Sequence, residues 1–109
     1  NITLVPNLGI NKYYYLLGKS DLLIGNSSSG IIESCSFKIP CINLGNRQKN
    51  RFAPDNIIHS AFNINVIKRK YKYAISNKFI KKVKKLKNPY YLKNTSKNIL
   101  DLTYKKIKV

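Results

Sequence analysis

The sequence has no methionine, no tryptophan and very few acidic residues. Among its 109 residues, 4 Asp and Glu stand against 21 Lys and Arg, which gives a formal net charge of +17. No apolar run reaches the length of about 18 residues that a membrane-spanning helix needs, so we expect one small soluble domain without a membrane span. Because the initiator Met and the pattern of a secretory signal are both absent, we also expect a piece of a longer protein.

Cysteine and histidine are scarce as well. Cys35 and Cys41 lie six positions apart, which matches neither a CxxC redox pair nor a zinc-ligand spacing, and His59 is the only histidine. We therefore interpret both cysteines as small core residues, and His59 as structural rather than as a catalytic base. Nothing in the sequence resembles a catalytic triad, a metal cluster or a pair of carboxylates, so we predict neither a metal nor a cofactor. The few cysteines fit a reducing, cytoplasmic location.

Most of the positive charge lies after position 67, in KRKYKY, KFIKKVKKLK and YKKIKV, where Lys alternates with apolar residues and Tyr. This pattern indicates amphipathic helices with a solvated face. A field of this sign attracts nucleic acid, anionic lipid or phosphorylated metabolites. Lys outnumbers Arg and no nucleic-acid-binding motif accompanies it, while the bias toward Lys, Asn, Ile and Tyr is typical of AT-rich codons. A cationic nucleic-acid-binding module is therefore kept only as the last alternative.

Short apolar runs alternate with helical patterns along the chain. The runs at 2–5 and 21–25 show no polar alternation, which indicates strands covered on both faces. We therefore predict an α/β fold, with a Rossmann-like parallel sheet and helices on both faces. The expected strands cover residues 2–5, 21–25, 41–45 and 56–64, and the expected helices cover residues 10–17, 28–37, 66–75, 77–86 and about 95–108.

The stretch GNSSSG, residues 25–30 and called the serine run below, joins an expected strand to an expected helix. Such clusters often serve turn chemistry alone. At this junction, however, small residues let backbone N–H groups approach an anion, the helix dipole favours negative charge, and hydroxyls add donors. The stretch matches neither GxxxxGK[ST] nor GxGxxG. It predicts a site that holds a nucleotide diphosphate rather than one that cleaves a triphosphate.

Charged side chains are expected near the serine run. Glu33 follows Gly30 by three residues, and it either complements the helix dipole or accepts both hydroxyls of a ribose. The loop after the third expected strand carries Arg47 and Arg51, and a guanidinium can hold a phosphate through two hydrogen bonds. We interpret Lys49 in the same loop as solvated. Together these residues favour an anion site over a linker.

The string IGNSSSGIIESCSFKIPCINLGNRQKNR resembles the C-terminal half of UDP-N-acetylglucosamine 2-epimerases, especially the hydrolysing enzymes of sialic-acid and related nonulosonate synthesis. In that family a loop reading GNSS[SC]G is followed by a Glu and then by a phrase similar to FG-PVINLG-RQ-GR. This chain has the same order and spacing. Its later NPY and NTS segments resemble the family's NPYGDGN region.

The resemblance implies a GT-B architecture, in which the substrate lies between two Rossmann-like domains and residues 1–109 form the second. It implies an enzyme that converts UDP-N-acetylglucosamine to N-acetylmannosamine and UDP, with its acid and base groups in the absent N-terminal domain, so that this segment alone binds UDP but is inactive. Whether subunits pair stays open. Carried over by motif, the residues that hold UDP are Ser27, Ser28, Ser29, Gly30, Glu33 and Arg47, with Gln48, Arg51 and Asn7 as further candidates.

The chain departs from the family pattern at a few positions. Lys38 stands where the family usually has Gly, Asn50 stands where Gly often precedes the second Arg of the loop, and NPYYLKN replaces NPYGDGN. These differences indicate a diverged member of the pattern. Separately, the alternative reading keeps the fold and makes the chain the donor-nucleotide-binding half of a GT-B glycosyltransferase, which uses the same diphosphate site.

Overall fold

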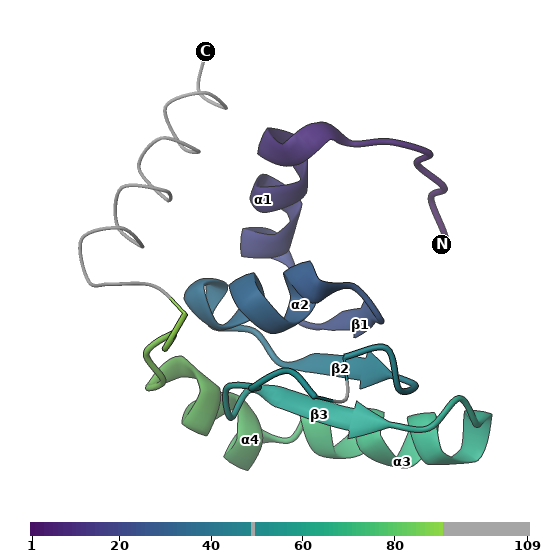
Figure 1. Ribbon diagram of the computed structural model, residues 1–109, viewed down its shortest axis with the longest axis vertical. Helices are drawn as coiled ribbons and strands as arrows, with labels where there is room; N and C mark the ends of the chain where they lie inside the picture. Colours follow the sequence, from purple (N-terminus) through teal and green to yellow (C-terminus); the bar gives the residue numbers. More distant parts are fainter. Residues whose placement is uncertain (49, 91–109) are drawn as a thin grey trace.

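The computed structural model describes residues 1–48 and 50–90 (Figure 1). Lys49 and the expected closing helix at about 95–108 lie outside the described residues. The elements are α1 (Gly9–Lys19), β1 (Leu23–Gly25), α2 (Ser28–Glu33), the 3-10 helix η1 (Ser34–Phe37), β2 (Cys41–Leu44), β3 (Ile57–Ser60), α3 (Ile64–Ala74) and α4 (Asn77–Lys84).

The three strands form one parallel sheet in the order β1-β2-β3. Leu23 of β1 pairs with Cys41 of β2, which in turn pairs with Ile57 of β3. The crossover from β1 to β2 contains α2 and η1, whereas the described residues between β2 and β3 include no helix. The parallel sheet confirms the predicted α/β class.

Helices cover both faces of this sheet. On one side α2 contacts β1 and β2, and on the other side α3 contacts β2 and β3 (Figure 1). The central strand β2 is buried through Cys41, Ile42 and Asn43, as expected for a strand between two layers. The main apolar core lies on the α3 and α4 side and consists of Ile42, Ile58, Ala74, Phe79 and Val83.

Short polar side chains cap the N-termini of α2, α3 and α4. The Oγ of Ser27 accepts a hydrogen bond from the backbone N–H of Ser29, and Asn63 and Ser76 cap α3 and α4 in the same way. Each cap supplies an acceptor for N–H groups that have no partner within the helix. The predicted helices at 10–17, 66–75 and 77–86 are thus confirmed as α1, α3 and α4, within a few residues at their ends.

Lys38 ends η1 in the left-handed backbone conformation, with a φ of 60°. Its backbone N–H donates to the carbonyls of Cys35 and Ser34, as in the caps where Gly is the usual residue. The residue that departs from the family pattern therefore occupies a position that costs a non-glycine residue about 1 kcal/mol.

Three expectations about the first half of the chain are wrong. Residues 2–5 are not a buried strand, because Ile2 and Leu4 are 91% and 89% exposed and pair with no described strand. β-Branched residues favour extended structure only where a neighbouring strand and a covering layer are present. The strand β1 was expected to be covered on both faces, but it lies at the edge of the sheet and its Ile24 is 44% exposed. The expected helix at 28–37 divides into α2 and η1 at Ser34.

Candidate functional site

The serine run lies at the carboxyl end of β1 and turns directly into α2. Gly25 ends the strand, Ser27 caps the helix, and its Oγ accepts from the N–H of Ser29 at 3.2 Å. Gly30 is buried against the sheet: a Cβ there would lie 3.1 Å from Sγ of Cys41 and 3.3 Å from Cδ2 of Leu23. The glycine therefore allows the first turn of α2 to sit close to β1 and β2.

A cavity of about 610 Å³ opens beside this turn. One wall is residues 5–10, a second wall is the side of α1 with Tyr13 and Tyr14, and the serine run and Glu33 close the third. Five predicted site residues meet here; they are Asn7, Ser27, Ser29, Gly30 and Glu33. A cavity of this size is typical of sites for small ligands.

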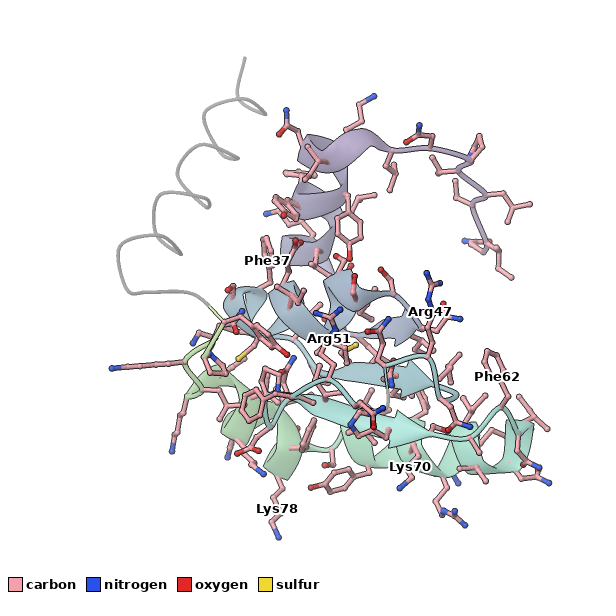
Figure 2. The ribbon with its side chains drawn as sticks, in the orientation of Figure 1. Phe37, Arg47, Arg51, Phe62, Lys70 and Lys78 are labelled. Atoms are coloured by element: carbon pink, nitrogen blue, oxygen red, sulfur yellow. The ribbon has the colours of Figure 1, made fainter. Side chains whose placement is uncertain are left out.

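The other predicted residues lie elsewhere. Ser28 is not among the residues that line the cavity. Arg47, Gln48 and Arg51 line a smaller space of about 350 Å³, together with Asn46 and Asn50. Arg47 and Arg51 are exposed, and Figure 2 shows both on the loop that follows β2. The structure thus gathers the predicted site into two neighbouring groups rather than one.

Gln48 connects the two groups. Its side chain is only 6% exposed, and its Nε2 donates to the backbone carbonyl of Asn26 in the serine run at 3.3 Å. Its Oε1 accepts from Nε of Arg51 at 3.0 Å. The sequence placed Gln48 among the candidate ligands, whereas the structure places its amide between two protein partners.

Tyr13 is a residue of the cavity that sequence reasoning missed. Its Oη lies 2.8 Å from Oγ of Ser29, which lies 3.3 Å from Oε2 of Glu33. Burial raises the pKa of Tyr13 above its ordinary value, the hydrogen bond with Ser29 lowers it, and the charge of Glu33 raises it again. The phenol is therefore protonated at neutral pH and supplies a hydrogen-bond donor to the cavity. Its contacts are 16 residues away in sequence, so no local pattern indicates them.

The thiol of Cys41 lies at the base of the cavity and is unsuited to nucleophilic chemistry. Burial raises its pKa to about 12, and a hydrogen bond with Ser34 lowers it less than burial raises it. The thiolate is the reactive form of cysteine, so this group stays inert at neutral pH. Cys35 is fully buried and its pKa is also raised by burial. Both cysteines are free and buried, which confirms their interpretation as core residues.

His59 pairs with a buried amide rather than with an acid. Nδ2 of Asn43 lies 3.1 Å from Nδ1 of His59, on the neighbouring strand in register. Because an amide nitrogen can only donate, Nδ1 of the imidazole accepts and the ring is held across the two strands. This contact supports the structural role that the sequence indicated.

Across residues 1–48 and 50–90, no group of three or more His, Cys, Asp and Glu side chains lies close enough to hold a metal ion. In the same residues no helix has the length and apolar character to cross a membrane.

Comparison with known proteins identifies the family. The family model described as UDP-N-acetylglucosamine 2-epimerase matches residues 1–103. The GDP/UDP-N,N'-diacetylbacillosamine 2-epimerase (hydrolyzing) of Campylobacter jejuni is 55% identical over 60 residues, which are 55% of this chain and 16% of that protein. The polysialic acid biosynthesis protein P7 of Escherichia coli is 40% identical over 82 residues, 75% of this chain and 21% of that protein.

A third relative, the UDP-N,N'-diacetylbacillosamine 2-epimerase (hydrolyzing) of Legionella pneumophila, is 40% identical over 58 residues, which are 53% of this chain and 15% of that protein. The chain therefore spans about a fifth or less of the length of these curated relatives. The resemblance seen in the motif string is confirmed: the chain belongs to the UDP-N-acetylglucosamine 2-epimerase family.

Proposed function

We propose that this chain is the UDP-binding part of a hydrolysing UDP-N-acetylglucosamine 2-epimerase, which converts UDP-N-acetylglucosamine to N-acetylmannosamine and UDP. One observation carries the proposal: Ser27, Ser29, Gly30 and Glu33 meet Asn7 around one cavity at the carboxyl end of β1. In parallel α/β sheets this edge is where ligands bind. The word hydrolyzing in the names of two relatives supports the choice of reaction.

In this proposal the serine run holds the diphosphate of UDP. Backbone N–H groups of the first turn of α2 and the hydroxyls of Ser27, Ser28 and Ser29 are donors at a positive helix end. The protonated phenol of Tyr13, 2.8 Å from the hydroxyl of Ser29, extends this set of donors. Because all these groups are neutral, they hold the anion by hydrogen bonds and leave charge neutralisation to the arginines.

Glu33 binds the ribose in the same proposal. It is the only carboxylate that lines the cavity among the described residues, and it lies one helical turn past Ser29. A carboxylate accepts hydrogen bonds from two hydroxyls at once, as the acidic residue of dinucleotide folds does. The uracil would then lie toward the other wall, near Pro6 and Leu8.

The loop after β2 that carries Arg47 and Arg51, called the arginine loop below, supplies positive charge to the nucleotide in this proposal. Arg47 and Arg51 are exposed around the smaller space, and Gln48 of the same loop donates to the carbonyl of Asn26 in the serine run. A guanidinium can hold two phosphate oxygens in its plane. These two residues would therefore stabilise the diphosphate that leaves when the sugar is released.

The proton transfers of the reaction are assigned to the part of the protein outside this chain. A 2-epimerase must remove the proton at C2 of the sugar, expel UDP and add water. The cavity offers one carboxylate, Glu33, and the inert thiol of Cys41, which do not make an acid and base pair. We therefore propose that the remaining domain of a GT-B enzyme is the partner of this segment, in the cytoplasm.

Calorimetric titration of the chain with UDP tests the proposal. We expect binding that weakens about tenfold in Ser29→Ala and in Glu33→Gln, since each loses hydrogen bonds to the ligand. Asn65→Ala, at an exposed position of α3, is the matched control and should bind as the unchanged chain does. Two results would overturn the proposal in favour of the cationic nucleic-acid-binding module. One is an affinity for UDP that neither site variant changes, and the other is equally tight binding of random DNA with a steep salt dependence.

A further inference from the structure

We infer that Gln48 is a positioning residue that ties the arginine loop to the serine run and so presents Arg51 to the diphosphate. The inference rests on the proposed function, because it concerns how the same site is assembled. It differs from the role that the motif suggests, in which Gln48 itself touches UDP.

Burial and hydrogen bonding argue against direct contact with a ligand. The Gln48 side chain is 6% exposed, whereas its neighbours Arg47 and Asn50 are exposed. Both ends of its amide are occupied, Nε2 by the carbonyl of Asn26 at 3.3 Å and Oε1 by Nε of Arg51 at 3.0 Å. A buried amide with a partner at each end fixes those partners relative to one another.

The two partners belong to segments that no other side-chain hydrogen bond described here joins directly. Asn26 lies in the serine run, 22 residues before Gln48, and Arg51 lies three residues after it. A backbone bond from the N–H of Arg51 to the carbonyl of Gln48 at 3.1 Å closes the local turn. The amide of Gln48 therefore fixes the guanidinium of Arg51 relative to the serine run.

The contact with Gln48 leaves the two terminal nitrogens of the Arg51 guanidinium free to bind the ligand. The contact with Gln48 uses Nε, one of five N–H donors, while the bidentate grip on phosphate can be made by the two terminal nitrogens. Holding Nε in place selects one orientation of a long side chain that would otherwise sample many. Ordering the side chain before binding strengthens the later contact.

Variants of Gln48 and Arg51 test the inference in the chain with UDP and with uridine. Gln48→Met keeps the length of the side chain but removes both hydrogen bonds, so we expect UDP to bind about tenfold more weakly, with uridine affinity unchanged. Arg51→Met should weaken UDP binding by a similar factor. Adding Gln48→Met to Arg51→Met should then cost less than threefold more, because Gln48 acts through Arg51.

A ligand-free measurement separates positioning from loss of folding. Amide hydrogen exchange at residues 26–29 should become about tenfold faster in Gln48→Met, while exchange in α4 stays unchanged. Asn65→Ala should change neither value. Fully additive effects of the two substitutions on UDP binding, or unchanged exchange at 26–29, would overturn the inference. Failure of the unchanged chain to bind UDP would instead overturn the proposed function. The exchange measurement would still test whether Gln48 holds the serine run in place.

Discussion

The two faces of the sheet are built from different chemistry. On the α3 and α4 face the buried side chains are hydrocarbon or aromatic, with Ile42, Ile58, Phe79 and Val83 packed together. On the α2 face Ile31 and Cys35 are also buried, but a polar network is buried beside them, in which Nδ2 of Asn56 donates to Oγ of Ser34 and to the carbonyl of Ile39. We infer that the α3 and α4 face supplies most of the stability, whereas the polar network on the α2 face fixes the position of the site.

The polar network lies at the η1 end of the crossover, near the amino ends of β2 and β3, and it reaches the serine run through Ser34. The hydroxyl of Ser34 donates to the carbonyl of Gly30, and the N–H of Cys41 donates to the carbonyl of Asn56. These bonds join α2, β2 and the start of β3 with directional contacts, which apolar packing does not provide. The position of α2 therefore depends on these hydrogen bonds as well as on the burial of Ile31.

The largest effect is expected from the apolar face. Phe79 is 3% exposed and packs against Tyr73 with 4.8 Å between ring centroids. Phe79→Ala should lower the free energy of unfolding by about 3–5 kcal/mol, measured by urea denaturation. Phe62→Ala is the matched control, since Phe62 is 71% exposed, and it should change little. Equal losses in the two variants would contradict the assignment of this face as the core.

A smaller effect is expected from the polar face. Asn56→Ala removes two hydrogen bonds from a fully buried position and should cost about 1–3 kcal/mol, with weaker UDP binding in the fraction that remains folded. Asn65→Ala, at an exposed position, should cost under about 0.5 kcal/mol. If Asn56→Ala lost stability but kept the full UDP affinity, the polar face would have no special part in positioning the site.

Alkaline pH should act on the polar face through Cys41. Burial raises the pKa of Cys41 in the folded chain from 9.0 to about 12. Because the unfolded chain loses this proton at a lower pH, the contribution of Cys41 to stability is complete below about pH 9 and is lost as the pH rises toward 12. At pH 10 the loss should be about 1 kcal/mol, since one pH unit corresponds to about 1.4 kcal/mol. Denaturation curves of the chain and of Cys41→Ala at pH 8 and pH 10 measure it. The prediction fails if the two proteins lose stability equally.

The smallest effect is expected at the end of η1. Lys38→Gly relieves a left-handed backbone at φ 60° and should raise stability by about 1 kcal/mol, less whatever the contact of its Nζ with the carbonyl of Leu86 contributes. Thermal unfolding measures the gain, and Lys38→Ala serves as the control because it loses the amine but keeps the strain. A glycine variant no more stable than the alanine variant would show that the backbone is not strained.

Local patterns predicted most of the fold. The helices at α1, α3 and α4 follow from apolar spacing, and the strands β1, β2 and β3 follow from short apolar runs. Residues 2–5 have the same apolar character but remain exposed. The composition of a strand does not state whether a partner strand is present, so the error could not be found from the sequence.

Sequence patterns indicate which residues of one segment lie together, but they miss contacts between distant segments. Ser27, Ser29, Gly30 and Glu33 line one cavity, because a strand, turn and helix in succession place them together. Tyr13 and the amide of Gln48 act through partners 16 and 22 residues away. Such contacts depend on how α1 and the arginine loop pack, which no short pattern encodes.

The most direct test of the account is the place where UDP changes the backbone of the chain. Amide chemical shifts followed by NMR during a UDP titration should move at residues 27–30 and at Glu33, and should stay constant along α3 and α4. This result would place the nucleotide at the first turn of α2. Shifts that spread over the lysines of α3 and α4, with none at residues 27–30, would show binding by charge alone and contradict the account.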